Sequence, residues 1–237
     1  MVIEVDSFND IIKYFELNLL KTFNKNTKSI SDLLVKCYSD NIDYLLSIDI
    51  DRSVKMKQLR TMYLNQEEID RVKSEMIKYS DFPNDYQVIY NFNNVGGKEI
   101  STHHKKGGCL TKITFTFLKR KKLEIQIDFR ASVVPYNLYY DLIMLHNLFK
   151  ELGLDQIKID KVYYFNFNEV KGKLMQNFFY YISAGYYDIP ENFVNFEYGK
   201  MMVEEYNKAE NSSYHSTKRF WGKCNDAMEK RRDKNGK

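Results

Sequence analysis

The sequence predicts an α+β fold with a large mixed, mainly antiparallel sheet and helices on one face. Three observations predict this class. Apolar residues recur at helical spacing near the N-terminus, the middle of the chain alternates strictly between apolar and polar residues, and a long apolar stripe of helical period follows. Helices and strands that occur in separate blocks are typical of α+β domains.

The N-terminal third predicts three helices. Residues 8–23 repeat apolar side chains at helical spacing. A second helix is expected from Ser29 or Ser31 through Cys37, because leucines and the cysteine recur three and four positions apart. A third is expected over residues 66–79, ahead of a proline that a helix interior excludes.

The middle of the chain predicts strands. Residues 87–92 have strand composition, and residues 112–117 and 123–129 alternate between apolar and polar side chains, as half-buried strands do. The charged segment LKRKK between the last two is short enough to be a turn, so they are expected to form a hairpin.

A helix and a further strand follow the hairpin. Residues 137–154 place leucines and a phenylalanine on one helical stripe, and Gly153 is a suitable C-terminal stop. Residues 161–170 return to alternation, and residues 173–187 and 198–210 have the pattern of helices.

The apolar pattern limits the register of the hairpin. Phe117 must face an apolar partner, which is either Leu123 or Ile125. These two registers put Cys109 opposite one of two residues, Ala131 or Val133.

Both registers bring Cys109 to the end of the hairpin that carries Arg130 and Ser132. Strict alternation, however, puts the thiol on the apolar face and the guanidinium on the other. A β-bulge, or a break at Gly107 and Gly108, is therefore needed to bring both side chains into one site.

Length and composition indicate one globular domain. The chain has 237 residues and 28.4 kDa, with 43% hydrophobic and 15% aromatic residues, so it can bury a substantial core. No stretch has the length of a membrane helix, the first residues lack the pattern of a secretory signal, and three cysteines at unrelated spacings form no disulfide framework. We expect a reduced, cytoplasmic protein without membrane contact.

Charge divides the chain into a body over residues 1–213 and a basic tail over 214–237. The tail holds eight lysines and arginines against three carboxylates, within a total net charge of +4. The tail is either a solvated terminal helix or an arm that contacts phosphates of nucleic acid, with Trp221 and Phe220 among its cations.

Cys109 is the candidate nucleophile because cations surround it in the sequence. A thiolate is the reactive form of cysteine, and neighbouring positive charges favour it. The alternative is a small hydrophobic residue in a strand. His103 and His104 lack an accompanying carboxylate cluster, so no metal site is expected. Asp141 and Glu169 are possible acids or bases, although a surface carboxylate is the commoner role.

The segment from Gly107 to Phe149 resembles the central part of thymidylate synthases and pyrimidine nucleotide hydroxymethylases. In that family a strand begins with the catalytic cysteine, its hairpin partner carries Arg-Ser to the nucleotide phosphate, and a Phe-Asn pair opens a long helix. Cys109, Arg130, Ser132 and Asn137 occur here in that order at similar spacings. The likeness covers roughly residues 105 to 170.

The resemblance implies a site for a pyrimidine nucleotide. Cys109 would attack carbon six of the base, and carbon five would then accept a one-carbon unit. Arg130 would hold the phosphate with Ser132, and Asn137 would read the base edge. The resemblance also implies that Tyr164 or Asn166 contacts the sugar of the nucleotide. Lys105 and Lys106 would contact its phosphate. The resemblance also implies a homodimer, packed through the sheet face without helices, and a folate one-carbon donor.

The chain departs from the family pattern at several positions. The residues flanking Cys109 are Gly108 and Leu110 where the family has Pro and His, and Ala131 separates the arginine from the serine. An arginine-rich phosphate loop and the paired arginines lent by a partner subunit are missing, and the sole tryptophan, Trp221, lies in the tail. These losses bear most on the use of folate. Two hypotheses therefore remain: a transferase acting on carbon five, or a non-catalytic protein of similar fold that binds nucleotide, nucleic acid or a protein partner.

Overall fold

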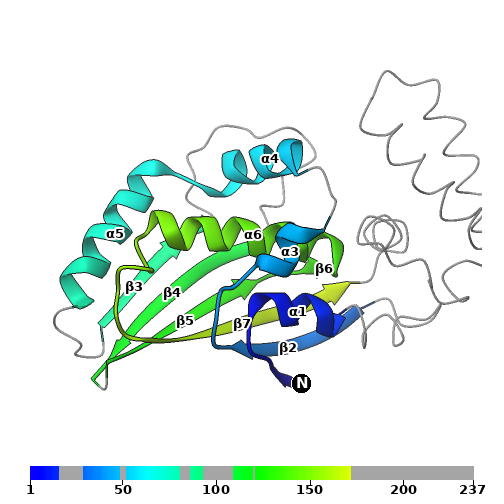
Figure 1. Ribbon diagram of the computed structural model, residues 1–237, viewed down its shortest axis with the longest axis horizontal. Helices are drawn as coiled ribbons and strands as arrows, with labels where there is room; N and C mark the ends of the chain where they lie inside the picture. Colours follow the sequence, from blue (N-terminus) through cyan, green and yellow to red (C-terminus); the bar gives the residue numbers. More distant parts are fainter. Residues whose placement is uncertain (16–28, 49–51, 81–85, 93–108, 120, 172–237) are drawn as a thin grey trace, which may run out of the picture. The chain divides into compact units, whose positions relative to one another are not determined.

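A computed structural model describes residues 1–15, 29–48, 52–80, 86–92, 109–119 and 121–171 (Figure 1). Apart from Ser47 and Ile48, these residues belong to one compact unit formed by residues 1–46 and 51–172. The predicted division between a body ending at residue 213 and a basic tail lies outside the described residues. So do the two helices predicted over 173–187 and 198–210.

The described strands form one mixed sheet of seven strands. Its order is β1-β2-β7-β5-β4-β3, and β6 pairs with β7 beyond that path. Pairing is antiparallel between β2 and β7, β3 and β4, and β4 and β5, whereas β1–β2, β5–β7 and β6–β7 are parallel. The strands are β1 (Val2–Glu4), β2 (Ser29–Cys37), β3 (Tyr86–Asn91), β4 (Leu110–Leu118), β5 (Lys122–Phe129), β6 (Ser132–Val133) and β7 (Asp160–Lys171).

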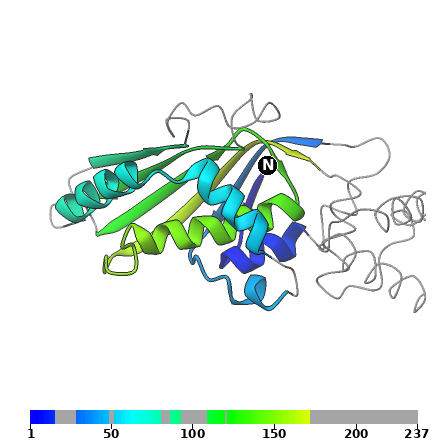
Figure 2. The ribbon, with the colours of Figure 1, turned by 90° about the horizontal axis from the view of Figure 1, so that it is seen from above.

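The helices lie on one side of this sheet, which confirms the predicted α+β class (Figures 1 and 2). The long helix α6 packs against the inner face, where the ring of its Phe149 lies 6.3 Å from that of Phe115 on β4 and 5.7 Å from that of Tyr163 on β7. Helix α5 runs beside the edge strand β3. The helices are α1 (Phe8–Tyr14), α3 (Asp43–Ser47), α4 (Ser53–Tyr63), α5 (Gln66–Ser80) and α6 (Tyr136–Glu151).

Most predicted elements occur where the pattern placed them. The third predicted helix is α5, the strand over 87–92 is β3, the hairpin is β4–β5, and the strand over 161–170 is β7. Helix α6 ends at Glu151, and Gly153 follows with a φ of +79°, the left-handed conformation that ends helices. The first predicted helix is α1 up to Tyr14, and its expected continuation from residue 16 lies outside the described residues.

The helix predicted from Ser29 or Ser31 through Cys37 is wrong, because this segment is strand β2. Its inward residues are Leu33, Val35 and Cys37, which alternate with more exposed ones and pair across to Phe167, Phe165 and Tyr163 of β7. Hydrogen bonding to β1 on one side and β7 on the other outweighs the local helical spacing. None of the described helices is long and apolar enough to cross a membrane.

Candidate functional site

The end of the β4–β5 hairpin contains a bulge that sets Cys109 opposite Arg130. Phe117 pairs with Leu123, the first of the two predicted registers, and this register continues to Lys112 opposite Asp128. The next pair is Leu110 with Phe129, so Thr111 is an extra residue in β4. The hydroxyl of Thr111 donates to the carbonyl oxygen of Asp128 at 3.0 Å.

The bulge shifts the partner of Cys109 by one residue. The backbone N–H of Arg130 donates to the carbonyl oxygen of Cys109 at 2.8 Å, so neither Ala131 nor Val133 faces the cysteine as predicted. Residues directly opposite each other in an antiparallel pair project to the same side. The predicted need for a bulge is thereby met at Thr111, while Gly107 and Gly108 lie outside the described residues. Cys109 is half-buried and Arg130 is exposed.

A buried tyrosine holds the start of β4. Tyr63 is the last residue of α4 and is 2% exposed. Its hydroxyl oxygen accepts hydrogen bonds from the backbone N–H groups of Cys109, at 2.7 Å, and Leu110, at 3.4 Å. Because these two donors occupy the oxygen, the hydroxyl proton of Tyr63 is directed elsewhere. Burial, and then the nearby charge of Asp141, raise the pKa of Tyr63, which keeps it protonated.

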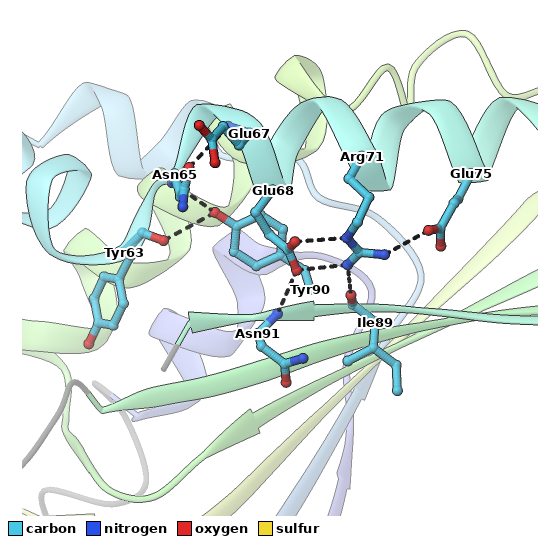
Figure 3. Close-up of polar contacts among 9 residues, drawn as sticks. All are labelled: Tyr63, Asn65, Glu67, Glu68, Arg71, Glu75, Ile89, Tyr90 and Asn91. Atoms are coloured by element: carbon cyan, nitrogen blue, oxygen red, sulfur yellow. Dashed lines mark hydrogen bonds and ion pairs between the residues drawn. The ribbon is translucent and has the colours of Figure 1, made fainter. Parts of the chain in front are cut away.

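The turn after α4 is fixed by a second tyrosine (Figure 3). The hydroxyl of Tyr90 on β3 donates to the carbonyl oxygen of Tyr63 at 3.1 Å and accepts the N–H of Asn65 at 3.2 Å. The rings of Tyr63 and Tyr90 both pack on Phe92, at centroid distances of 5.2 and 5.0 Å. Tyr90 and Phe92 therefore position Tyr63, whose hydroxyl holds a residue 46 positions further along the chain.

Helix α5 is bound to the free edge of β3 beside this turn (Figure 3). Arg71 donates to the carbonyl oxygen of Ile89 at 2.6 Å and forms ion pairs with Glu68 at 2.7 Å and Glu75 at 2.8 Å. Glu68 in turn accepts the N–H of Asn91 at 3.5 Å. These contacts satisfy edge groups that would otherwise be open to another strand.

Among the described residues, two buried polar atoms near the start of α6 have no hydrogen-bond partner. They are the hydroxyl oxygen of Ser132, a residue 1% exposed, and Oδ1 of Asn137, in the first turn of α6. A buried polar group without a partner costs about 1–3 kcal/mol, so such groups are uncommon in folded proteins. Both residues were predicted to bind the nucleotide, and both present atoms that a ligand would satisfy.

Asp141 lies inside the fold, so the expectation of a surface carboxylate is wrong. It is 3% exposed, on α6, one turn beyond Asn137. Burial raises the pKa of Asp141 to about 7, and the charge of Lys55 on α4 opposes this rise. Tyr63 was not predicted as a site residue, and Asp141 was predicted only as a possible acid or base. The sequence signal for Asp141 was a single carboxylate within the apolar run YYDLIML.

The predicted sugar contacts lie on the outer face of the sheet. Asn166 pairs with Asp128 across β5 and β7 and donates its amide to that carboxylate at 2.6 Å. Tyr164 lies two residues earlier on the same face, opposite Gln126. The inner face of β7, with Phe165 and Phe167, packs against the helices. A sugar contact by Tyr164 or Asn166 stays a prediction.

Several predicted residues lie outside the described part of the chain. These are Lys105 and Lys106, the two histidines before them, and the basic tail with Trp221. Within the described part, no group of three or more His, Cys, Asp or Glu side chains is arranged to hold a metal ion.

Solved structures that resemble the chain include two thymidylate synthases. No family model and no curated protein sequence matches the chain. A thermostable thymidylate synthase A from Bacillus subtilis matches with a TM-score of 0.38 and 11% identity, over 70% of this chain and 78% of the synthase. A thymidylate synthase from T4 phage matches with a TM-score of 0.29 and 16% identity, over 44% of this chain and 32% of that one. At these TM-scores, the function has to be argued from the residues of the chain itself.

Proposed function

We propose that the chain is a transferase that adds a one-carbon unit to carbon five of a pyrimidine nucleotide through a covalent adduct on Cys109. The observation that carries this proposal is the bulge at Thr111. It sets a half-buried thiol opposite an arginine, at a strand end where Tyr63 fixes the backbone. A nucleophile needs such access together with a fixed position, and a neighbouring guanidinium favours the thiolate.

The unpartnered atoms support a nucleotide as the ligand. Oδ1 of Asn137 is an acceptor and requires an N–H donor, which the ring of uracil or the amino group of cytosine supplies. The hydroxyl of Ser132 donates to or accepts from a phosphate oxygen, and Arg130 is a permanently charged phosphate donor.

The proposed reaction balances as follows. The thiolate of Cys109 forms a bond to carbon six, and the electron pair of the carbon five–carbon six double bond moves to carbon five and its carbonyl. Carbon five then forms a bond to the one-carbon unit of a donor, while the donor's own bond to that unit breaks and its electron pair leaves with the donor. Carbon five next loses its hydrogen as a proton. The sulfur–carbon bond breaks last, and the double bond returns.

The described residues assign no contact to the one-carbon donor. The described residues present two unpartnered polar atoms, which match one small polar ligand, and no second set that fits a folate. No step is therefore assigned to a folate. We propose further that a second copy of the chain packs on the outer sheet face, which no described helix covers (Figure 2), and that the protein works in the cytoplasm.

Release of the carbon-five hydrogen tests the proposal without a donor. Deoxyuridylate or deoxycytidylate carrying tritium at carbon five should release it to water with the wild-type protein and retain it with Cys109→Ala. Cys37→Ala is the matched control, because that thiol is buried in the core and should not affect release. Nucleotide binding without release by the wild type would identify a binding protein and end the transferase proposal.

A further inference from the structure

Asp141 is the one carboxylate among the described residues that is buried in the core. None of the described residues forms a hydrogen bond with its carboxyl group, and the charge of Lys55 opposes the rise of its pKa. An ionised carboxylate without hydrogen bonds is strongly disfavoured inside a protein, so a residue kept there needs a role that outweighs this cost.

The surroundings of Asp141 are those of the thiol site. It follows Asn137 by four residues on α6, so the two side chains share one face of the helix. Its charge acts on Tyr63, and the charge of Cys109 acts on the same hydroxyl. Among the described residues, the titratable groups whose charges couple with Asp141 are therefore Lys55 and Tyr63 of α4, and Tyr63 is coupled in turn with Cys109.

Tyr63 has a hydroxyl proton to give. Its oxygen already accepts two backbone N–H groups, and among the described residues no acceptor is bound to its proton. Hydrogen bonds between catalytic groups are often long without substrate and shorten in the complex. A carboxylate that approaches this hydroxyl in the complex would take its proton.

We propose that Asp141 is the proton acceptor behind Tyr63 in the thiol site. When the adduct on Cys109 loses its carbon-five hydrogen, that proton displaces the longer of the two hydrogen bonds to the Tyr63 oxygen, the one from the N–H of Leu110 at 3.4 Å. The proton then bonds to this oxygen while the hydroxyl proton of Tyr63 passes to the Asp141 carboxylate. The electron pair of the broken carbon–hydrogen bond stays on carbon five, where it forms the new double bond. Asp141 acts through Tyr63 and is thus a positioning residue. This inference rests on the proposed function for the identity of the substrate.

The first test needs no catalysis. The rate at which iodoacetamide alkylates Cys109 is followed from pH 5.5 to 9 by mass spectrometry of the peptide that contains it. In the wild type, Asp141 ionises near pH 7, and its negative charge disfavours the thiolate of Cys109. The plot of alkylation rate against pH should therefore have an inflection near pH 7 and rise less steeply above it. Asp141→Asn should give a single titration and react faster at pH 8 by about threefold, the effect of half a pKa unit.

Two variants keep this test falsifiable. Lys55→Met removes the positive charge that lowers the pKa of Asp141, so the inflection should move to higher pH. Asp155→Asn, at an exposed carboxylate, should leave the wild-type profile unchanged. The inference would be overturned if the wild type and Asp141→Asn gave the same dependence of alkylation rate on pH. It would also be overturned if the inflection stayed at the same pH in Lys55→Met.

The second test uses tritium release. Asp141→Asn and Tyr63→Phe should each slow release by about 100-fold, within the range of general acid–base effects. The double variant should be no slower than either, because the two groups act as one unit. If the wild type releases no tritium while the inflection in the alkylation rate of Cys109 still depends on Asp141, the proposed function fails. In that case the electrostatic coupling between Asp141 and Cys109 still stands. If release occurs and Asp141→Asn leaves its rate and pH profile unchanged, only the inference about Asp141 fails.

Discussion

Replacing Asp141 by Asn should make the protein more stable above pH 5, by an amount that grows with pH. The unfolded chain releases the Asp141 proton near the ordinary pKa of 3.8, whereas the folded chain holds it up to about pH 7. Between these values the folded state binds one proton more than the unfolded state. The free energy of unfolding of the wild type therefore falls as pH rises through this window, and levels off above it.

The size of the effect follows from the pKa difference. The pKa rises from 3.8 to about 7, which is about 3 units, and each unit corresponds to 1.36 kcal/mol. The whole window is thus worth about 4 kcal/mol. The measurable part, from pH 5 to pH 8, spans about 2 units of the window and about 3 kcal/mol.

Urea unfolding at pH 5, 6, 7 and 8 measures this loss. Other groups titrate over the same range, so the quantity to compare is the difference in unfolding free energy between Asp141→Asn and the wild type at each pH. It should grow by about 3 kcal/mol from pH 5 to pH 8. Asp155→Asn should show no such growth, because its carboxylate is exposed. A difference that stays constant with pH, or shrinks, would refute the buried, raised-pKa carboxyl from which the reasoning starts.

Three further predictions concern the support of the site. Tyr90→Phe loses the two hydrogen bonds that fix the α4–α5 turn, so it should lower the free energy of unfolding in urea by about 1–2 kcal/mol. Tyr86→Phe changes an exposed tyrosine on the same strand and should leave this free energy unchanged. Equal effects of the two changes would contradict the prediction. Arg71→Ala uncovers the edge of β3, so light scattering by the protein should increase with its concentration. The free energy of unfolding should change by less than about 1 kcal/mol, because the ion pairs of Arg71 are exposed. Unchanged scattering would contradict the prediction that Arg71 protects this edge from pairing with another chain. Burial raises the pKa of the Cys37 thiol, so in the native protein iodoacetamide should modify Cys109 well before Cys37, and equal rates would contradict the assigned burial.

The hairpin shows what the sequence could predict of the fold. Alternating apolar residues and a short turn limited the register to two choices, and Phe117 opposite Leu123 was one of them. The same pattern predicted either a bulge or a break at Gly107 and Gly108, but it did not point to Thr111, because threonine is not a turn-forming residue. Its hydroxyl stabilises the bulge through a contact with Asp128 that only the pairing reveals.

Strand β2 and the residues around Cys109 show where local pattern fails. In the segment from Ser29 to Cys37, leucines at helical spacing coexist with alternating residues, and the pairing partners that decide between the two are far away in sequence. Tyr63 reaches Cys109 across 46 residues, and the burial of Asp141 depends on α4 packing over α6. Contacts of this range leave no periodic signal.

The covalent bond between Cys109 and carbon six is the central claim, and carbon-13 NMR tests it most directly. A deoxyuridylate or deoxycytidylate labelled with carbon-13 at carbon six is mixed with excess protein. A fraction of the carbon-six resonance should leave the unsaturated region and appear where a saturated carbon bonded to sulfur resonates, and Cys109→Ala should abolish that signal. A bound nucleotide whose carbon six stays unsaturated with the wild-type protein would contradict the account.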